Sequence, residues 1–341
     1  MKTYLDDVKA VAALPLPWEK LEGCNILITG ATGLIGSCLV EILMSREHRT
    51  YHVYASGRDV QRASAIFGAL ADDPNFHFFP YDVMLPLSGD VEFQYIIHAA
   101  SGASPNCFAS NPVEVIKANI IGVANLMDYG RTHGLRRLLY VSSGEVYGEG
   151  DGRDFTEDYS GYVDCTQPRS CYPASKRAAE TLCVSYMAEY GIDAVIARPS
   201  HTYGPNFTAS DNRVYAQFIR NVLCGEDIVM KSSGRQFRSW CYVVDCASAL
   251  LHILLCGEGG RAYNVADDTS NISIRELAEM IASIAGRKVV VAAPSDEELK
   301  GFNVVSRATF DTSRLASLGW QAKGSMQEKM ERVINRVKSG R

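Results

Sequence analysis

A glycine triplet that directly follows an apolar run constrains the fold of this chain more than any other feature. Residues 24–29 (CNILIT) are short and apolar, which is typical of a buried parallel strand. Gly30, Gly33 and Gly36 stand between this run and a helical pattern at residues 37–46. A tight turn at this place brings backbone N–H groups and the positive end of the helix toward a phosphate group. The GxxGxxG spacing therefore predicts a strand–turn–helix unit that binds the pyrophosphate of a dinucleotide.

Strand-like and helical segments alternate along the chain up to about residue 200. Short apolar runs predict six strands, at residues 24–29, 52–56, 75–79, 95–98, 138–141 and 194–197. Helical patterns separate several of them, at residues 37–46, 60–70, 112–133 and 172–190. Connections of this length join parallel strands, so the sequence predicts an α/β fold with a Rossmann-type, doubly wound parallel sheet.

The alternation of strand-like and helical segments becomes less regular after about residue 200, where Gly, Pro, Asn and Ser become frequent. Two amphipathic helical patterns follow at residues 274–285 and 325–338, and Ser273 and Glu276 have the spacing of a capping box. We therefore expect a smaller C-terminal lobe that binds the substrate. The predicted division assigns residues 1–198, with a return at 240–265, to an NAD(P)-binding Rossmann domain, and residues 199–239 and 266–341 to the lobe.

Composition argues against several classes of protein. The 341 residues carry a formal net charge of −5, so we expect no binding to nucleic acid or to an anionic membrane surface. No apolar run approaches the ~20 residues that cross a bilayer, and the first residues lack the pattern of a signal peptide. The ten cysteines include no CxxC pair, and the seven histidines show no ligand spacing with them. We expect a cytoplasmic protein with reduced thiols, no membrane segment and no metal site.

The end of the second predicted strand bears on the type of dinucleotide. An acidic residue there accepts the ribose hydroxyls of NAD, whereas a basic residue pairs with the 2′-phosphate of NADP. Gly57 occupies the position expected for the acid and Arg58 follows it, which favours NADP. Asp59 can still turn inward and an arginine can also stack on adenine, so NAD and NADP both stay open. Further cofactor contacts are expected after the third and fourth strands, from Asp82, Ala99, Ala100 and Ser101.

Three side chains are spaced as a proton-transfer group requires. Tyr172 and Lys176 lie four residues apart at the start of a helical stretch, which places both on one face of the helix. An ammonium group near a phenol favours the phenolate, so we expect the pKa of Tyr172 to fall below its reference value of ~10. Ser143 follows the strand at 138–141, at the edge where open α/β sheets bind ligands. The set predicts transfer of a hydroxyl proton beside a bound dinucleotide.

Over nearly the whole chain, the motifs and their order resemble an extended short-chain dehydrogenase/reductase of the nucleotide-sugar epimerase, dehydratase and decarboxylase group. This resemblance implies NAD or NADP as cofactor, a nucleotide-diphosphate sugar as substrate, and a homodimer formed through the helices at 112–133 and 172–190. The residues that carry it are TGATGLIG (29–36), HAAS (98–101), Asn119, SSGEVYG (142–148), YPASK (172–176), RPSHTYGP (198–205), GRQFRSWCYVVD (234–245) and LGW (318–320).

The resemblance also implies roles for individual residues. Tyr172 would be the acid–base group, Lys176 would bind the nicotinamide ribose, and Ser143 would bond the reacting oxygen. Arg238 matches a position that the family uses on the substrate diphosphate, and His201 stands where the family usually has an Asn that contacts the phosphates. The remaining expected contacts are Ser104 for the substrate and, for the cofactor, Gly30, Thr32, Gly33, Leu34, Ile35, Gly36 and Asn119.

The residues after Ser143 help to choose the reaction. The 4,6-dehydratases of the group carry an Asp–Glu pair there, whereas this chain has Gly144 and Glu145, so a standard 4,6-dehydratase is disfavoured. Glu145 and residues 168–172 resemble UDP-glucuronate decarboxylases, although residues 173–175 depart from their acidic-then-Gly pattern. The leading hypothesis is decarboxylation or epimerisation through a transient 4-keto sugar, with Glu145 catalytic. The alternatives are a Glu145 that only orders its loop, an NADPH-dependent 4-ketoreductase, and a non-catalytic dinucleotide-binding protein.

Overall fold

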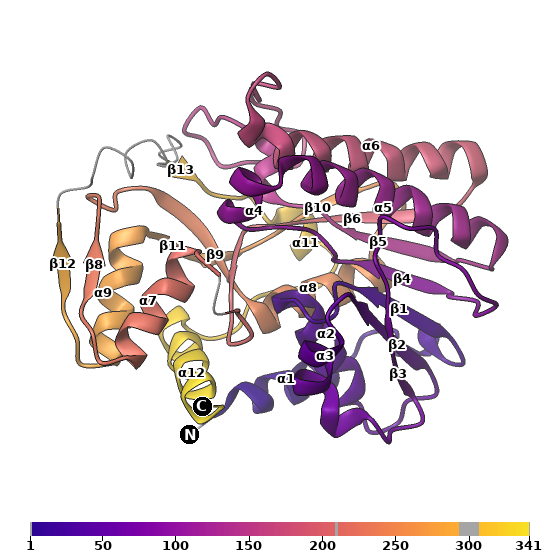
Figure 1. The fold of residues 1–341 in the computed structure, drawn as a ribbon, viewed down its shortest axis with the longest axis horizontal. Helices are drawn as coiled ribbons and strands as arrows, with labels where there is room; N and C mark the ends of the chain where they lie inside the picture. Colours follow the sequence, from indigo (N-terminus) through magenta and orange to yellow (C-terminus); the bar gives the residue numbers. More distant parts are fainter. Residues whose placement is uncertain (1, 209–210, 293–306, 341) are drawn as a thin grey trace.

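A seven-stranded parallel sheet forms the centre of the protein (Figure 1). The computed structural model describes residues 2–208, 211–292 and 307–340. All pairings in the sheet are parallel, and the order of the strands is the doubly wound order, so the predicted fold class is confirmed. In spatial order the strands are β10 (Ala262–Val265), β6 (Asp193–Pro199), β5 (Arg137–Val141), β4 (Tyr95–His98), β1 (Asn25–Thr29), β2 (His52–Gly57) and β3 (Phe76–Pro80).

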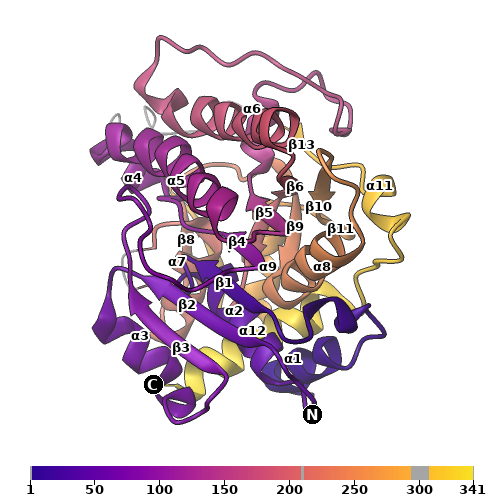
Figure 2. The ribbon, with the colours of Figure 1, turned by 90° about the vertical axis from the view of Figure 1, so that its right-hand side faces the viewer.

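Helices cover both faces of this sheet because its strands are apolar on both sides. In β1, Ile26 and Ile28 pack on one side and Leu27 packs on the other, and all three are completely buried. This two-sided burial explains the near-continuous apolar runs of the sequence. Figure 2 shows the two helix layers on opposite sides of the sheet. They are α2 (Leu34–Met44) and α8 (Val243–Cys256) on one side, and α5 (Pro112–Thr132) and α6 (Cys171–Tyr190) on the other.

Two helices begin earlier than the sequence patterns predict. The helix expected from Ser37 begins a turn earlier, at Leu34, and extended Gly33 (φ −78°, ψ 175°) is its N-cap. The pattern misplaces this boundary because glycine has a low helix propensity, whereas the close packing of α2 on the sheet requires Gly36 inside the helix. The helix expected from Tyr172 begins at Cys171 and contains Pro173 in its first turn, where a proline removes no helical hydrogen bond.

Within the described residues, a smaller lobe is built around two further sheets. One contains β7 (His201–Tyr203), β9 (Phe237–Tyr242), β11 (Asp267–Ser273) and β13 (Arg307–Ala308), and the other pairs β8 (Ile228–Met230) with β12 (Val289–Val291). The lobe also contains α7 (Val214–Leu223), α9 (Ile274–Ile284) and α12 (Met326–Ser339), as Figure 1 shows. The predicted capping box of α9 is confirmed, because the side chains of Ser273 and Glu276 each bond the other residue's amide.

The chain crosses between the lobe and the large sheet more than once. β9 continues within the smaller sheet to Tyr242, and α8, which packs on the large sheet, begins at Val243. Lys329 of α12, which is 1% exposed, forms ion pairs of 2.8 Å with both Asp245 of α8 and Asp267 of β11. Lys329 therefore connects the smaller lobe with a helix that packs on the large sheet. The division of the chain into two domains stays a prediction.

Shorter elements complete the fold. They are α1 (Tyr4–Ala12), η1 (Trp18–Leu21), α3 (Val60–Phe67), η2 (Gly68–Leu70), α4 (Pro105–Ser110), η3 (Gly144–Tyr147), η4 (Pro168–Ser170) and α11 (Ser313–Ala316). None of the helices in the described part of the chain is long and apolar enough to span a bilayer.

Candidate active site

The three glycines form the tight turn that their spacing predicts. Gly30 has φ +68°, and a Cβ atom there would lie 2.7 Å from the backbone of Ala100. At Gly36 a Cβ atom would lie 2.3 Å from the carbonyl oxygen of Gly30. Gly33 leaves α2 without a side-chain cap, and Leu34 and Ile35 form the first turn of this helix. A close turn that ends at an uncapped helix N-terminus fits the pyrophosphate of a dinucleotide.

The end of β2 lies beside this turn. A Cβ atom at Gly57 would lie 3.2 Å from the Oγ1 atom of Thr32. The side chain of Arg58 is exposed, and its guanidinium group lies 3.9 Å from the carboxylate of Asp82. Asp59 does not turn inward, because its carboxylate accepts a hydrogen bond from a backbone amide of α3 at 2.9 Å and caps that helix. At this edge β2 therefore presents an arginine rather than a carboxylate.

Arg62 belongs to this region, although the sequence analysis does not single it out. Its Nε atom donates a hydrogen bond to the carbonyl oxygen of Thr32 at 3.0 Å, and its Nη2 atom donates to that of Asn206 at 3.4 Å. The side chain therefore holds the glycine turn against the segment after β7. No spacing in the sequence signals a contact between segments so far apart.

The segment after β4 lies next to the glycine turn, as expected of residues that line a cofactor. Ala99 and Ala100 are in close contact with that turn. The hydroxyl of Ser101 donates to Oδ1 of Asn119 at 2.8 Å, and Nδ2 of Asn119 donates to the hydroxyl of Ser175 at 2.9 Å. Asn119 is completely buried. Asn119 therefore connects the segments around it through its hydrogen bonds. Because its side chain is completely buried, it does not reach the surface where we expected it to contact the cofactor.

Tyr172, Ser143 and Lys176 come together where β5 ends and α6 begins. The hydroxyl of Ser143 is close enough to the phenol of Tyr172 to affect its pKa, and Tyr172 is 6% exposed. The Nζ atom of Lys176 donates to the carbonyl oxygen of Val141 at 2.8 Å and lies 5.7 Å from the centre of the Tyr172 ring. The hydroxyl, the phenol and the amine of the predicted proton-transfer group are therefore neighbours.

The acid–base balance of this group differs from the sequence-based expectation. Burial and the carboxylate of Glu145 raise the pKa of Tyr172 above its usual value. The neighbouring hydroxyl of Ser143 and the guanidinium groups of Arg213 and Arg169 act in the opposite direction, but with less effect. Burial also lowers the pKa of Lys176 to about 7. The prediction that Lys176 lowers the pKa of Tyr172 is wrong in this structure, because the buried site disfavours the charged form of both groups.

Glu145 lies beside the phenol and is held in an ion pair. Its two carboxylate oxygens accept hydrogen bonds from Nη2 of Arg169 at 2.9 and 3.1 Å. The guanidinium group of Arg169 lies 4.5 Å over the ring of Phe108, and this ring stacks on that of Tyr172 at 4.6 Å. Glu145 and Arg169 are both partly exposed, and ion pairs of this kind are held weakly in water. A ligand in the site can therefore compete for either partner.

A ring from the smaller lobe fills the space beside Gly144. A Cβ atom at Gly144 would lie 2.2 Å from the Cζ atom of Phe310. Gly144 has no positive φ, so the position requires glycine for space and not for backbone conformation. An aspartate side chain therefore has no room at this position, which agrees with the argument against a standard 4,6-dehydratase.

Basic side chains of the lobe gather around His201. His201 lies in β7 with its ring 5.3 Å from that of Trp240, and Arg238 lies in β9 and is 4% exposed. The protein atoms that surround His201, together with the guanidinium groups of Arg238 and Arg213, lower its pKa to about 4, although part of the ring is accessible to solvent. Burial also lowers the pKa of Arg238. A partly desolvated cationic group of this kind suits an anionic ligand.

Arg213 is another residue of the site that no sequence motif indicates. Its Nε and Nη2 atoms donate to the carboxylate of Asp211 at 3.0 and 2.5 Å, and Nη2 reaches the hydroxyl of Tyr215 at 3.2 Å. The electrostatic influence of Arg213 reaches both Tyr172 and His201. The residue lies in the loop before α7, away from any strand end, so the sequence gives no sign of its place in the site.

Ser104 caps a helix near the site. Its hydroxyl accepts a hydrogen bond from the amide of Cys107 at 3.4 Å and donates to the sulfur of that residue at 3.2 Å, which makes Ser104 the N-cap of α4. The same helix carries Phe108, the residue that stacks on Tyr172. Ser104 is therefore close to the phenol, and its role in binding substrate stays a prediction.

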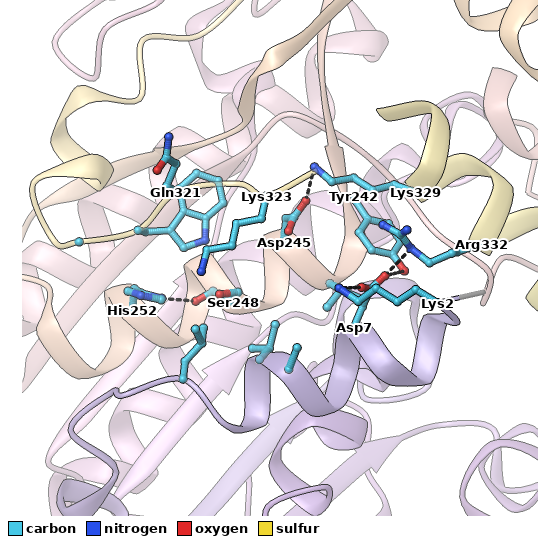
Figure 3. A pocket seen from close by; sticks show the side chains of 16 residues that line it. Lys2, Asp7, Tyr242, Asp245, Ser248, His252, Gln321, Lys323, Lys329 and Arg332 are labelled. Carbon is cyan, nitrogen blue, oxygen red and sulfur yellow. Dashed lines mark hydrogen bonds and ion pairs between the residues drawn. The ribbon is translucent and has the colours of Figure 1, made fainter. Parts of the chain in front are cut away.

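A pocket of about 390 Å³ lies elsewhere, between α1, α8 and the segment before α12 (Figure 3). Its lining includes neither Ser143 nor Tyr172, and most of its charged groups are paired with one another. Asp7 pairs with Lys2 at 2.7 Å and with Arg332 at 2.6 Å. The clustered acid–base groups, and not this pocket, mark the candidate active site. Among the described residues there is also no group of three or more His, Cys, Asp and Glu side chains placed to hold a metal ion.

Known proteins share both the sequence and the fold. The chain is 35% identical to UDP-glucuronic acid decarboxylase 6 of Arabidopsis thaliana over 311 residues, which cover 89% of this chain and 86% of that protein. The UDP-glucose 4-epimerase of Thermus thermophilus, solved in complex with NAD, has a TM-score of 0.74 and 25% identity over 92% of this chain and 99% of its own. The dTDP-glucose 4,6-dehydratase of Streptomyces venezuelae has a TM-score of 0.81 at 22% identity, over 92% of this chain and 97% of its own, a likeness of fold.

These relatives are enzymes of the extended short-chain dehydrogenase class, so the predicted family and class of enzyme are confirmed. The family model described as "NAD dependent epimerase/dehydratase family" matches residues 26–266. This match spans β1 to the end of the large sheet, and it includes the glycine turn and the Tyr172 group. The chain therefore belongs to the NAD dependent epimerase/dehydratase family.

Proposed function

We propose that this protein converts a nucleotide-diphosphate sugar through a transient 4-keto sugar, with decarboxylation of a UDP-glucuronate-type substrate as the leading reaction and epimerisation as the other. The observation that carries the proposal is the group of Ser143, Tyr172 and Glu145 near Arg213, which together with Arg238 also affects His201. In this proposal the acid–base side chains transfer protons to and from the sugar, and the basic side chains bind its diphosphate. Similarity to UDP-glucuronic acid decarboxylases over 89% of the chain supports the choice of substrate.

The first step needs a base for the sugar hydroxyl at C4. As the phenolate, Tyr172 takes this proton, and the neighbouring Ser143 holds the oxygen as it becomes a carbonyl. A dinucleotide held at the glycine turn, by Gly30, Gly33 and Gly36, would supply the acceptor for the hydride on C4. Since burial raises the pKa of Tyr172, positive charge brought near the phenol favours the phenolate that this step needs.

The second step depends on what the ketone makes possible. A carbonyl at C4 makes a carboxylate on C5 a β-keto acid, so the bond to that carboxylate breaks, CO₂ leaves and its electron pair forms an enolate. The enolate then takes a proton at C5, and Tyr172 returns its proton to the oxygen as the hydride returns to C4. In this proposal Glu145 assists the proton transfer at C5; its position near Tyr172 and its partly exposed ion pair with Arg169 support this role.

Product analysis tests the proposal. Purified protein is incubated with UDP-glucuronate, UDP-glucose and UDP-GlcNAc, and the products are followed by NMR. We expect CO₂ and a UDP-pentose from UDP-glucuronate, with the dinucleotide unchanged in amount. An inverted hexose instead of a pentose selects epimerisation. No turnover across a broad panel of sugar nucleotides contradicts the proposal.

A reductive reaction is the second candidate, and the edge of β2 favours it. Arg58 is exposed there, and Asp59 is used as a helix cap, an arrangement that suits the 2′-phosphate of NADP. An NADPH-dependent 4-ketoreductase consumes its cofactor in proportion to product. Loss of NADPH absorbance with a 4-keto sugar nucleotide selects this reaction, whereas NAD that co-purifies with the protein favours the redox-neutral one.

We also propose a cytoplasmic homodimer. The helices α5 and α6 carry exposed apolar side chains, among them Val113, Ile116, Ile121 and Tyr190, which suit an interface between two copies. The ten cysteines are free thiols, which suits a reducing compartment. Light scattering should give twice the mass of the chain, and Ile121→Arg should lower it. A wild-type monomer contradicts the dimer.

A further inference from the structure

The segment at residues 307–311 runs from the smaller lobe to the catalytic turn. Its first two residues form β13, which pairs with β9 at Arg238. The amide of Phe310 donates to the hydroxyl of Ser239 at 3.1 Å. On its other side, the segment forms two backbone hydrogen bonds with Phe155. The amide of Phe155 donates to the carbonyl oxygen of Thr309 at 2.7 Å, and the amide of Asp311 donates to the carbonyl oxygen of Phe155 at 2.9 Å. The segment is therefore fixed between the strand that carries Arg238 and the loop that follows η3.

The ring of Phe310 lies against the turn that carries the acid–base groups. It is 4% exposed and meets the rings of Tyr147 and Phe155 edge-on at 5.7 and 5.8 Å. Its Cζ and Cε1 atoms are the ones that a Cβ atom at Gly144 would meet, at 2.2 and 2.6 Å. The ring and the glycine therefore fill complementary space, although they lie far apart in the sequence.

Ser143 and Glu145 both project from this turn. Ser143 is the N-cap of η3, and its hydroxyl accepts a hydrogen bond from the amide of Glu145 at 3.2 Å. A shift of the turn therefore moves the hydroxyl and the carboxylate together. We propose that Phe310 is a positioning residue, whose ring against Gly144 sets where the Ser143 hydroxyl and the Glu145 carboxylate stand relative to the bound sugar. This inference rests on the proposed function, in which both groups act on the substrate.

A cycle of substitutions at positions 144 and 310 tests the inference with UDP-glucuronate as substrate. In Gly144→Ala the new methyl group displaces the turn or the ring, so we expect kcat to fall by about 100-fold with KM little changed. Phe310→Leu loosens the turn, and we expect kcat to fall by about tenfold. Leucine lacks the Cζ and Cε1 atoms that the methyl group would meet. The double variant G144A/F310L should therefore turn over faster than G144A alone.

Phe93→Leu is the matched control. Phe93 is also 4% exposed and packs against two aromatic rings, those of Tyr54 and Tyr129, in a different part of the core. F93L should lower Tm as F310L does, but leave kcat near that of the wild type. A second readout needs no substrate: the amides of residues 144–147 should exchange hydrogen faster in F310L than in the wild type or in F93L.

The outcomes separate this inference from the proposed function. The role of Phe310 is overturned if the double variant G144A/F310L turns over no faster than G144A. It is also overturned if the amides of residues 144–147 exchange at the wild-type rate in F310L. If the wild-type protein turns over none of the sugar nucleotides, the proposed function fails. The exchange of amides 144–147 then still decides whether Phe310 fixes the turn.

Discussion

The two halves of the proposed site are built in different ways. The backbone turn of the dinucleotide half comes from one short segment, residues 30–36, which connects β1 directly to α2 and closes against the segment after β4. The sugar half is assembled from separate parts of the chain, near residues 143, 169, 201, 213, 238 and 310. The first half depends on a backbone shape that a local motif encodes. The second half depends on how distant segments pack, so single substitutions should affect the two halves differently.

Tyr172→Phe should have the largest effect, and it acts only on the sugar half. The variant keeps the ring that stacks on Phe108 and removes the hydroxyl that exchanges the proton. We expect kcat to fall by about 10³-fold, in the range of general acid–base catalysis. NMR of the products measures turnover, and calorimetry should give wild-type affinity for the dinucleotide. Wild-type turnover by Y172F contradicts the acid–base role of Tyr172.

Gly36→Ala breaks the dinucleotide half. A methyl group at this position would lie 2.3 Å from the Gly30 carbonyl oxygen and 2.8 Å from the Cα atom of Ala31, so the turn must open. We expect dinucleotide affinity to fall by about 100-fold, equivalent to about 3 kcal/mol. Calorimetry measures this loss, and Gly68→Ala is the control because no atom lies within 4 Å of the Cβ position there. Wild-type affinity in G36A would remove the glycine turn from the proposed site.

The difference between the two halves of the site also explains which features could be predicted from the sequence. The glycine turn, the strand order and the meeting of Ser143 with Tyr172 follow from local motifs and from the rules of parallel sheets. The contribution of Arg213 could not be predicted, because its loop reaches the phenol only through the packing of the lobe.

The burial of a side chain also could not be predicted from the sequence motifs. The spacing of Tyr172 and Lys176 is a property of one helix, and it predicts correctly that the two are neighbours. Their pKa values depend on how completely distant segments cover them, and this cover reverses the expected effect on the phenol. Asn119 shows the same limit, since its motif position gives no sign that neighbouring segments enclose it completely.

Arg213→Gln weakens the sugar half without removing an acid–base group. Loss of a charged hydrogen-bond donor should raise the KM for the sugar nucleotide by about tenfold. The variant should also raise the pKa of His201 from about 4 toward its ordinary value, because a neighbouring cation opposes protonation of the imidazole. An NMR titration of the ring measures this shift. Arg153→Gln is the control, since Arg153 is exposed and pairs with Asp151 on the surface, and an unchanged His201 titration in R213Q would contradict the electrostatic coupling.

Arg58→Ala should have the smallest effect, because it changes a side chain of the dinucleotide half and not its backbone. Arg58 is exposed, and its guanidinium group lies 3.9 Å from Asp82, a distance typical of a weak surface pair. If Arg58 holds the 2′-phosphate of NADP, the affinity for NADPH should fall by about fivefold, the upper range for an exposed ion pair, and the affinity for NADH should not change. Calorimetry with both dinucleotides measures the difference. Equal losses for NADH and NADPH would mean that Arg58 contacts the adenine and not the 2′-phosphate, and the 4-ketoreductase would then lose the observation that favours it.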